Sequence, residues 1–197
     1  MPVAPTGNEI TAVIVPPYFG FPCAVGVVGA VVVVVVLTVV VAVGASNTVV
    51  YTLDGTTWQS VTGPSPAVDL TTVDLRTKDG WWVGNASGAV YYTNNKGATW
   101  TQITGIQGTP TTIKVIKWYN ETVGYIAAVH AGPLGKIHRT INGGKTWYIM
   151  PENVGLSIPL NDAINALDCV PGDANIIFAG GLADNSNDGI LLKGSDS

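Results

Sequence analysis

The stretch that decides the fold is Thr140-Ile-Asn-Gly-Gly-Lys-Thr-Trp147, because three other stretches repeat its pattern. They are Tyr51-Thr-Leu-Asp-Gly-Thr-Thr-Trp58, Thr93-Asn-Asn-Lys-Gly-Ala-Thr-Trp100 and the incomplete Lys193-Gly-Ser-Asp-Ser197. The Asp or Asn of the pattern is Asp54, Asn95, Asn142 and Asp196 in turn, so the copies lie 41, 47 and 54 residues apart. A repeat of this length fits one unit of four short β-strands joined by turns.

The residues around each copy have the character of β-strands. Two hydrophobic segments precede each copy, at 39–44 and 48–51, 80–84 and 89–92, 125–129 and 136–139, and 176–180 and 190–192. A further strand follows each complete copy, as at 100–103. We therefore predict an all-β fold of β-propeller-type, four-stranded blades, about four in number, at 30–62, 66–104, 110–151 and 160–197.

The chemistry of the repeated turn is conformational. An Asp or Asn side chain accepts hydrogen bonds from backbone N–H groups of its own turn, and the glycine that follows supplies a positive φ. The tryptophan at the end is expected to bury its ring between neighbouring sheets. We assign structural roles on these grounds to Asp54, Trp58, Asn95, Gly97, Trp100, Asn142, Gly144, Trp147 and Asp196.

The pattern resembles the Asp-box, or bacterial neuraminidase repeat, S/T-x-D-x-G-x-T-W, over about residues 39–197. The copy at 140–147 follows it except for Asn142, and the copy at 93–100 also has Asn at the Asp position. The first copy is one residue short before Trp58, and the fourth has Gly194 for Ser or Thr. The resemblance implies a β-propeller. It says little about function, since the family includes sialidases, xyloglucan-cleaving hydrolases, sortilin-type receptors, photosystem II assembly factors and phage virion propellers.

The resemblance also implies that four blades are not a whole ring, because propellers of this family usually have six or more. We expect either a part of a longer protein or a propeller closed by a strand from elsewhere. Within the N-terminal segment 1–29, the apolar stretch 10–15 is the candidate for that closing strand of the last blade, and Pro16 and Pro17 would end it.

A valine-rich tract at 24–43 admits two interpretations. Its twenty apolar residues are long enough to cross a bilayer as a helix. Valine is β-branched and favours strands, however, and no Lys or Arg comes before Arg76 to orient a membrane segment. We favour strands and keep a membrane helix as the alternative.

Composition and charge exclude several functions. The chain has a net charge of −4 and only 9 Lys and Arg among 197 residues, without a basic cluster, so we expect no nucleic-acid binding. The three arginines that sialidases use are not available, since only Arg76 and Arg139 are present. A glycoside hydrolase needs two carboxyl groups facing one cleft, and the candidate acids are in no recognisable motif. They are Asp69, Asp74, Asp79, Glu121, Asp162 and Asp168.

Metal binding has one candidate in the sequence. The loop Asp184-Asn-Ser-Asn-Asp188-Gly189 resembles a Ca²⁺ loop in which Asp184, Ser186 and Asp188 offer oxygen ligands. Leu192 stands where a further acid is usual, so the ligand set is incomplete and a polar hairpin loop is the simpler interpretation. His130 and His138 flank a predicted turn and are expected to form a structural pair. No other cofactor is expected.

The sequence favours a non-catalytic structural or interaction module of an extracellular or virion assembly. Its partners would be other proteins or copies of itself, with a glycan as a further ligand class, because exposed sheet edges and apolar patches seek partners. The alternatives are a glycan-active hydrolase, or a fragment of one, and a membrane-anchored propeller.

Overall fold

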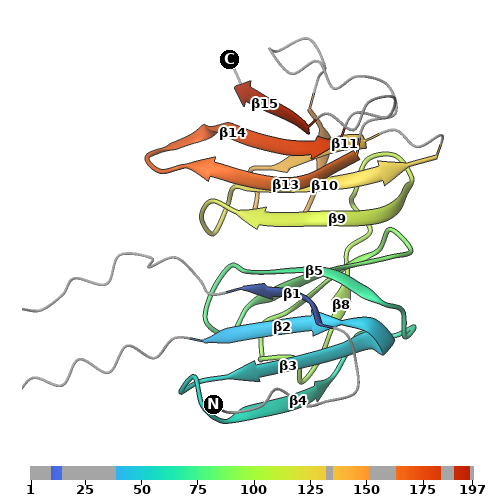
Figure 1. The fold of residues 1–197 in the computed structure, drawn as a ribbon, viewed down its shortest axis with the longest axis vertical. Coiled ribbons are helices and arrows are strands. Elements are labelled where there is room, and N and C mark those ends of the chain that lie inside the picture. Colours follow the sequence, from blue (N-terminus) through green and yellow to red (C-terminus); the bar gives the residue numbers. More distant parts are fainter. Residues whose placement is uncertain (1–9, 15–38, 132–134, 151–162, 183–188, 196–197) are drawn as a thin grey trace, which may run out of the picture.

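The computed structural model describes residues 10–14, 39–131, 135–150, 163–182 and 189–195, and within them the regular structure is almost entirely β-strand (Figure 1). The described strands form four sheets, and within each sheet every strand pairs antiparallel with the next along the chain. Sheet 1 contains β1 (Ile10–Ile14), β2 (Val40–Gly44), β3 (Thr48–Thr52) and β4 (Trp58–Thr62). Sheet 2 contains β5 (Leu70–Leu75), β6 (Trp81–Asn85), β7 (Val90–Thr93) and β8 (Thr101–Gln102).

The two remaining sheets follow the same order. Sheet 3 contains β9 (Pro110–Trp118), β10 (Gly124–His130), β11 (Gly135–Thr140) and β12 (Tyr148–Ile149). Sheet 4 has three described strands, β13 (Ala163–Val170), β14 (Asp173–Leu182) and β15 (Gly189–Ser195). The only described helix is a 3-10 turn, η1 (Ala45–Asn47), between β2 and β3. The predicted all-β fold of four-stranded antiparallel sheets is confirmed.

The sheets stack face to face in chain order, from sheet 1 at the bottom of Figure 1 to sheet 4 at the top. Three hydrophobic clusters lie between successive sheets. Strand β6 shows how alternation supplies two of them: Trp81 and Val83 face sheet 1, whereas Trp82 faces sheet 3. Each inner sheet is therefore apolar on both faces, which explains the high hydrophobic content of the chain.

The prediction for the N-terminal strand is wrong in its partner. Strand β1 does form, but it pairs with β2 in sheet 1, with Ile14 opposite Val41 and Val13 opposite Ala42. It fills the inner position of the first sheet and does not complete sheet 4. The predicted first blade, 30–62, assumed that the valine tract supplies the strand next to β2. In the structure β1 pairs with that edge of β2.

The valine tract is described only at its end. Residues 40–43 belong to β2, and Val41 and Val43 are fully buried against sheet 2. Residues 24–38 lie outside the described residues. Among the helices in the described part of the chain, none has the length and apolarity needed to span a membrane.

Candidate functional site

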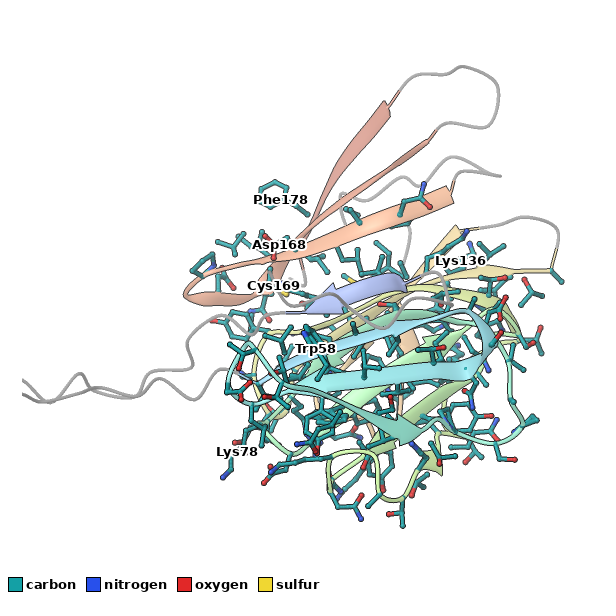
Figure 2. The ribbon with its side chains drawn as sticks, turned by 60° about the horizontal axis from the view of Figure 1, so that its bottom comes forward. Trp58, Lys78, Lys136, Asp168, Cys169 and Phe178 are labelled. Atoms are coloured by element: carbon teal, nitrogen blue, oxygen red, sulfur yellow. The ribbon has the colours of Figure 1, made fainter. Side chains whose placement is uncertain are left out.

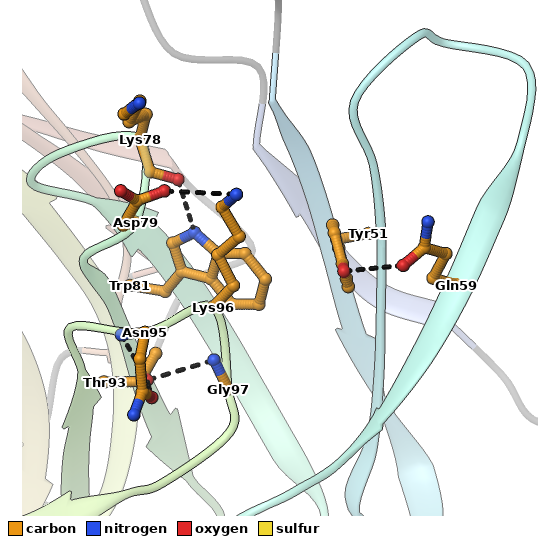
Figure 3. Close-up of polar contacts among 9 residues, drawn as sticks. All are labelled: Tyr51, Gln59, Lys78, Asp79, Trp81, Thr93, Asn95, Lys96 and Gly97. Carbon is orange, nitrogen blue, oxygen red and sulfur yellow. Dashed lines mark hydrogen bonds and ion pairs between the residues drawn. The ribbon is translucent and has the colours of Figure 1, made fainter.

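The repeated turns, called here the Thr–Asx turns, lie at 52–58, 93–100 and 140–147. In the second turn the Thr93 hydroxyl accepts the N–H of Asn95 (3.2 Å) and of Gly97 (3.0 Å) and donates to Asn95 Oδ1 (2.8 Å), as Figure 3 shows. Asn95 Oδ1 also accepts the N–H of Thr99 at 2.9 Å. The turn thus satisfies its own backbone N–H groups with two side chains.

The third turn repeats this geometry. Thr140 Oγ1 accepts the N–H of Gly144 at 3.1 Å, and Asn142 Oδ1 accepts the N–H of Thr146 at 3.1 Å. The amide of Asn142 makes one further hydrogen bond, in which its Nδ2 donates to Thr146 Oγ1 at 2.8 Å. An ionised carboxylate has no proton and could not donate this bond. Asparagine therefore keeps the accepting role of the Asp position and gains a donor.

The first turn is shorter and carries the carboxylate. Asp54 Oδ1 accepts the N–H of Thr57 (2.7 Å) and of Thr56 (2.8 Å), while Thr52 Oγ1 accepts that of Gly55 (3.0 Å). The N–H groups of Thr57 and Thr56 hold the pKa of Asp54 well below its usual range. The side chain is therefore ionised at neutral pH. Asp196 of the fourth copy lies outside the described residues.

Two of the three described tryptophans that end the turns, Trp100 and Trp147, pack onto the preceding sheet. Trp147 is fully buried between sheets 2 and 3, with its ring 6.0 Å from Trp82 and 5.6 Å from Trp118. Trp100 is half-buried against the cluster between sheets 1 and 2, and its indole N–H donates to Thr62 O of β4 at 2.9 Å. Trp58 is half-buried and belongs to none of the three clusters of described residues. The expectation of a ring buried between sheets is therefore not met at Trp58, where no described sheet precedes sheet 1.

The first strand of each sheet, β1, β5, β9 or β13, is called here the inner strand. Side chains of β5 join the inner strands of sheets 2 and 3. Thr71 Oγ1 donates to Ile113 O at 2.5 Å, and Thr72 Oγ1 accepts the N–H of Ile116 at 3.1 Å. Asp74 continues this row, because its Oδ2 accepts the N–H of Trp118. These three hydrogen bonds link β5 to β9 at the inner edge of the two sheets.

The Asp74 carboxyl is a buried structural group. It is 3% exposed, and its Oδ1 accepts the N–H of Leu75 at 2.9 Å, so both oxygens are engaged. Burial raises the pKa of Asp74 to about 6, although the N–H groups of Trp118 and Leu75 and the charge of Lys117 act in the opposite direction. A raised carboxyl pKa is typical of catalytic acids, but this group is closed to a substrate.

The neighbouring inner strand carries an ion pair. Lys117 Nζ on β9 lies 3.2 Å from Asp168 Oδ1 on β13, and the Asp168 side chain is 76% exposed. Asp168 Oδ1 also accepts the N–H of Cys169 at 3.0 Å. Cys169 is half-buried next to the cluster between sheets 3 and 4, and burial raises the pKa of its thiol to about 11. This thiol is neutral at physiological pH and a poor nucleophile.

The sequence identified Asp74 and Asp168 as candidate acids but missed Lys117 and Trp118 as their partners. The available signal was a charged residue near the end of the inner strands of sheets 2, 3 and 4, at Asp74, Lys117 and Asp168. The other candidate acids are dispersed: Asp69 accepts the N–H of Ser46 at 2.8 Å, Asp79 pairs with Lys96 at 3.4 Å, and Glu121 is exposed. Asp162 lies outside the described residues.

Both arginines bridge successive sheets. The Arg76 guanidinium lies 5.7 Å from the Trp82 ring and 5.5 Å from the Trp118 ring, and its Nη1 donates to Gly143 O at 2.9 Å. Arg139 Nη2 donates to Asn175 Oδ1 of sheet 4 at 2.7 Å. These contacts tie sheet 2 to sheet 3 and sheet 3 to sheet 4.

The two histidines stack and do not converge on a common point. Their ring centroids are 5.1 Å apart and nearly parallel at 18°, and His138 Nε2 lies 3.1 Å from Gln107 O. In the described ranges no group of three His, Cys, Asp or Glu side chains is placed to hold a metal ion. Asp184, Ser186 and Asp188 of the proposed Ca²⁺ loop lie outside those ranges.

The stacked four-stranded antiparallel sheets define a β-propeller, and solved structures with this fold confirm the predicted class. YCF48 from Cyanidioschyzon merolae has a TM-score of 0.61 at 17% identity, over 81% of this chain and 48% of that chain. YCF48 bound to a D1 peptide gives 0.54 at 18% identity, over 81% and 50%. A GH74 xyloglucanase from Xanthomonas campestris gives 0.55 at 15% identity, over 78% and 27%.

The present chain thus spans about half the length of the YCF48 chains that it resembles. No protein-family model and no curated protein sequence matches it. At these identities the likeness establishes the fold alone.

The glycines of the Thr–Asx turns provide a matched pair of substitutions. Gly55 and Gly144 both have positive φ, 73° and 85°, but a Cβ on Gly55 would meet nothing within 4 Å, whereas a Cβ on Gly144 would overlap the Trp82 ring. We expect Gly55→Ala to lower the free energy of unfolding by about 1 kcal/mol through its backbone conformation. Gly144→Ala should lose roughly 1–3 kcal/mol more through overpacking. Denaturant unfolding measures both, and equal losses would contradict the packing of the turn on Trp82.

The two perturbed carboxyls predict opposite pH dependences. Because the folded pKa of Asp74 is raised to about 6, its contribution to stability is full below about pH 4, the usual range of an unfolded Asp, and declines as pH rises to about 6. We expect the difference in unfolding free energy between the wild type and Asp74→Asn to fall by about 2–3 kcal/mol over that range.

Asp54→Asn is the control for this titration. Because the folded pKa of Asp54 is lowered, the wild type should lose stability relative to Asp54→Asn only as pH falls below about 4. Burial lowers the pKa of His138 to about 4, so this histidine makes the protein less stable as pH falls, which is the opposite of the Asp74 effect. His138 is present in every variant, so its titration cancels in the differences between variants. Urea unfolding at a series of pH values makes the measurement. A pH-independent difference for Asp74→Asn would contradict the buried carboxyl.

Proposed function

We propose that this chain is a non-catalytic interaction module of an extracellular or virion assembly, built on an Asp-box β-propeller. The observation that carries the proposal is the use of the inner-strand polar groups in structural contacts. Asp74 has both oxygens bonded to backbone N–H groups, and Asp168 is paired with Lys117.

The carboxyl pair supports a binding role better than a hydrolytic one. Glycoside hydrolysis by the usual route requires one carboxyl to protonate the leaving oxygen and a second to act on the opposite side of the sugar. Asp74 and Asp168 lie on nearby inner strands, but Asp74 is buried and only Asp168 reaches solvent. One accessible carboxyl in this cluster is insufficient for that chemistry.

The Thr–Asx turns support the assignment to the Asp-box family. Their side chains close the turn internally, and two of the three carry Asn in place of Asp while keeping the same bonds to the threonine hydroxyl and to a downstream N–H. Such turns stabilise a scaffold and leave the faces and edges of the propeller for recognition.

A protein partner is supported by the surface and by one structural neighbour. The chain carries 11% charged residues, and Ile141, Tyr148 and Phe178 are 64%, 61% and 39% exposed. Exposed large apolar side chains on a weakly charged surface favour association. YCF48, which shares the fold, has been solved bound to a D1 peptide. We infer a protein or peptide ligand for the present chain.

A glycan-active hydrolase, or a fragment of one, is the second candidate, because a GH74 xyloglucanase shares the fold. In this case Asp168 would be the accessible acid, and a second carboxyl would have to come from outside the described residues. A glycan could equally be bound without being cleaved.

Incubation with xyloglucan, mixed-linkage β-glucan and a sialylated oligosaccharide separates the two functions. We expect the wild-type chain to release no reducing ends or sialic acid under conditions in which a xyloglucanase and a sialidase, as positive controls, do so. Release by the wild type that is lost in Asp168→Asn would overturn the non-catalytic proposal. Asp69→Asn, which removes an exposed acid on a connection between sheets, is the matched control.

A further inference from the structure

Arg76 is a cation that the fold holds in place without neutralising its charge. Its guanidinium carbon lies 5.7 Å from the Trp82 ring centroid and 5.5 Å from that of Trp118, and the two rings are 4.8 Å apart. Its Nη1 donates to Gly143 O at 2.9 Å. Among the described residues no carboxylate forms an ion pair with it. The side chain is therefore restrained by two rings and one hydrogen bond but keeps its full charge.

The nitrogens of Arg76 show that hydrogen-bond acceptors are scarce around it. Its Nε is enclosed and has no hydrogen-bond partner within the described ranges, and the same holds for the indole nitrogens of Trp82 and Trp118. Its Nη2 has no partner in those ranges either, but this atom is not enclosed. Arg76 thus offers solvent a charged donor in a fixed position, to which the described chain supplies no acceptor.

The connections around Arg76 lie together at one end of sheets 2 and 3. They are 76–80, 94–100, 119–123 and 141–147, called here the basic end. Backbone hydrogen bonds join them in pairs, from Lys96 N to Asp79 O at 3.1 Å and from Gly143 N to Thr122 O at 2.9 Å. The bond from Arg76 Nη1 to Gly143 O links the two pairs. A ligand at Arg76 therefore meets the combined charge of all four connections.

The basic end is positive in a chain that is negative overall. The fold brings together the cations Arg76, Lys78, Lys96 and Lys145 and the acids Asp79 and Glu121, whereas the whole chain has a net charge of −4. Lys96 lies 3.4 Å from Asp79, and these two charges offset each other. Lys78 and Lys145 are exposed and form no ion pair with a described residue, and Figure 2 shows Lys78 at the margin of the molecule. The cations that are left outnumber the one remaining acid, Glu121, so this end attracts anions.

We propose that the basic end binds an acidic peptide segment of a partner protein, with a side-chain carboxylate of that segment accepting a hydrogen bond from Arg76 Nη2. This proposal rests on the interaction role proposed above and names the chemistry of the ligand. Arginine is enriched among the residues that dominate binding energy, and a restrained guanidinium loses little further entropy when a ligand binds. Lys78 and Lys145 favour a segment with several acids over a single terminal carboxylate, because each adds a separate positive charge.

Nuclear magnetic resonance titration of the 197-residue chain with two peptides tests this site. Arg76 and Arg139 are the two arginines of the chain, and Arg139, whose Nη2 donates to Asn175 Oδ1, is the internal reference. We expect the acetylated and amidated peptide Gly-Asp-Gly-Asp-Gly to shift the Arg76 Nε–H signal saturably, with a dissociation constant on the order of 1 mM. The matched neutral peptide, Gly-Asn-Gly-Asn-Gly, should shift neither arginine signal at the same ionic strength.

Substitutions separate a ligand contact from a purely structural one. The acidic peptide should also shift the indole N–H signals of Trp82 and Trp118 in the wild type, and Arg76→Gln should abolish this shift. Arg76→Lys should weaken binding about tenfold, because an ammonium lacks the planar fork of donors. Lys145→Gln should weaken it about two- to threefold. Lys136→Gln makes the same charge change at the other end of sheet 3 and should have no effect. An unchanged far-ultraviolet circular dichroism spectrum shows that each variant is folded.

The wild-type titration decides the proposal even if the Arg76 variants do not fold. An Arg76 signal that ignores the acidic peptide, or responds equally to the neutral one, overturns it. So does a folded Arg76→Gln variant that binds the acidic peptide as tightly as the wild type, or tighter binding of inorganic phosphate than of this peptide. An unresponsive Arg76 in a chain that also cleaves no glycan would overturn this site and leave the non-catalytic role standing.

Discussion

The structure depends on the packing of a turn tryptophan against the sheet that comes before it. At Trp147 the ring joins Trp82 and Trp118 with centroids 4.8–6.0 Å apart, the distance at which tilted aromatic pairs attract one another. Trp100 adds a hydrogen bond across the interface to Thr62 O. Two stacked sheets without such wedges would have flat apolar faces and no fixed registration, because hydrophobic attraction alone has no direction.

The Thr–Asx turn gives this contact its precision. The threonine hydroxyl and the Asp or Asn oxygen fix the backbone between the third strand and the tryptophan, and the glycine at 97 or 144 brings that backbone close to a neighbouring side chain. The same polar side chains that look functional in the sequence are therefore used within the fold. The inner-strand acid Asp74 is likewise used within the fold, since both of its oxygens accept backbone N–H groups.

Local chemistry explains which parts of this molecule the sequence revealed. The turns and their flanking strands were predictable because Thr, Asx and Gly act within a few residues of one another. The partner of β1 was not, because the 10–14 segment and β2 lie far apart in the sequence and any exposed strand edge could accept it. The bond from Asp74 to Trp118 spans 44 residues, and only an acid between two apolar residues, Val73 and Leu75, hinted at it. The incomplete burial of Trp58 depends on a neighbouring sheet that no local motif encodes.

Exchange of the six tryptophan indole protons with deuterium, followed by nuclear magnetic resonance at a concentration where the chain is monomeric, tests the central claim most directly. The account predicts slow exchange for Trp147, which is buried between sheets, and for Trp100, whose N–H is bonded to Thr62 O, and fast exchange for Trp58. Equal, fast exchange of Trp58, Trp100 and Trp147 would show that the turn tryptophans do not hold the sheets together, and would contradict the account.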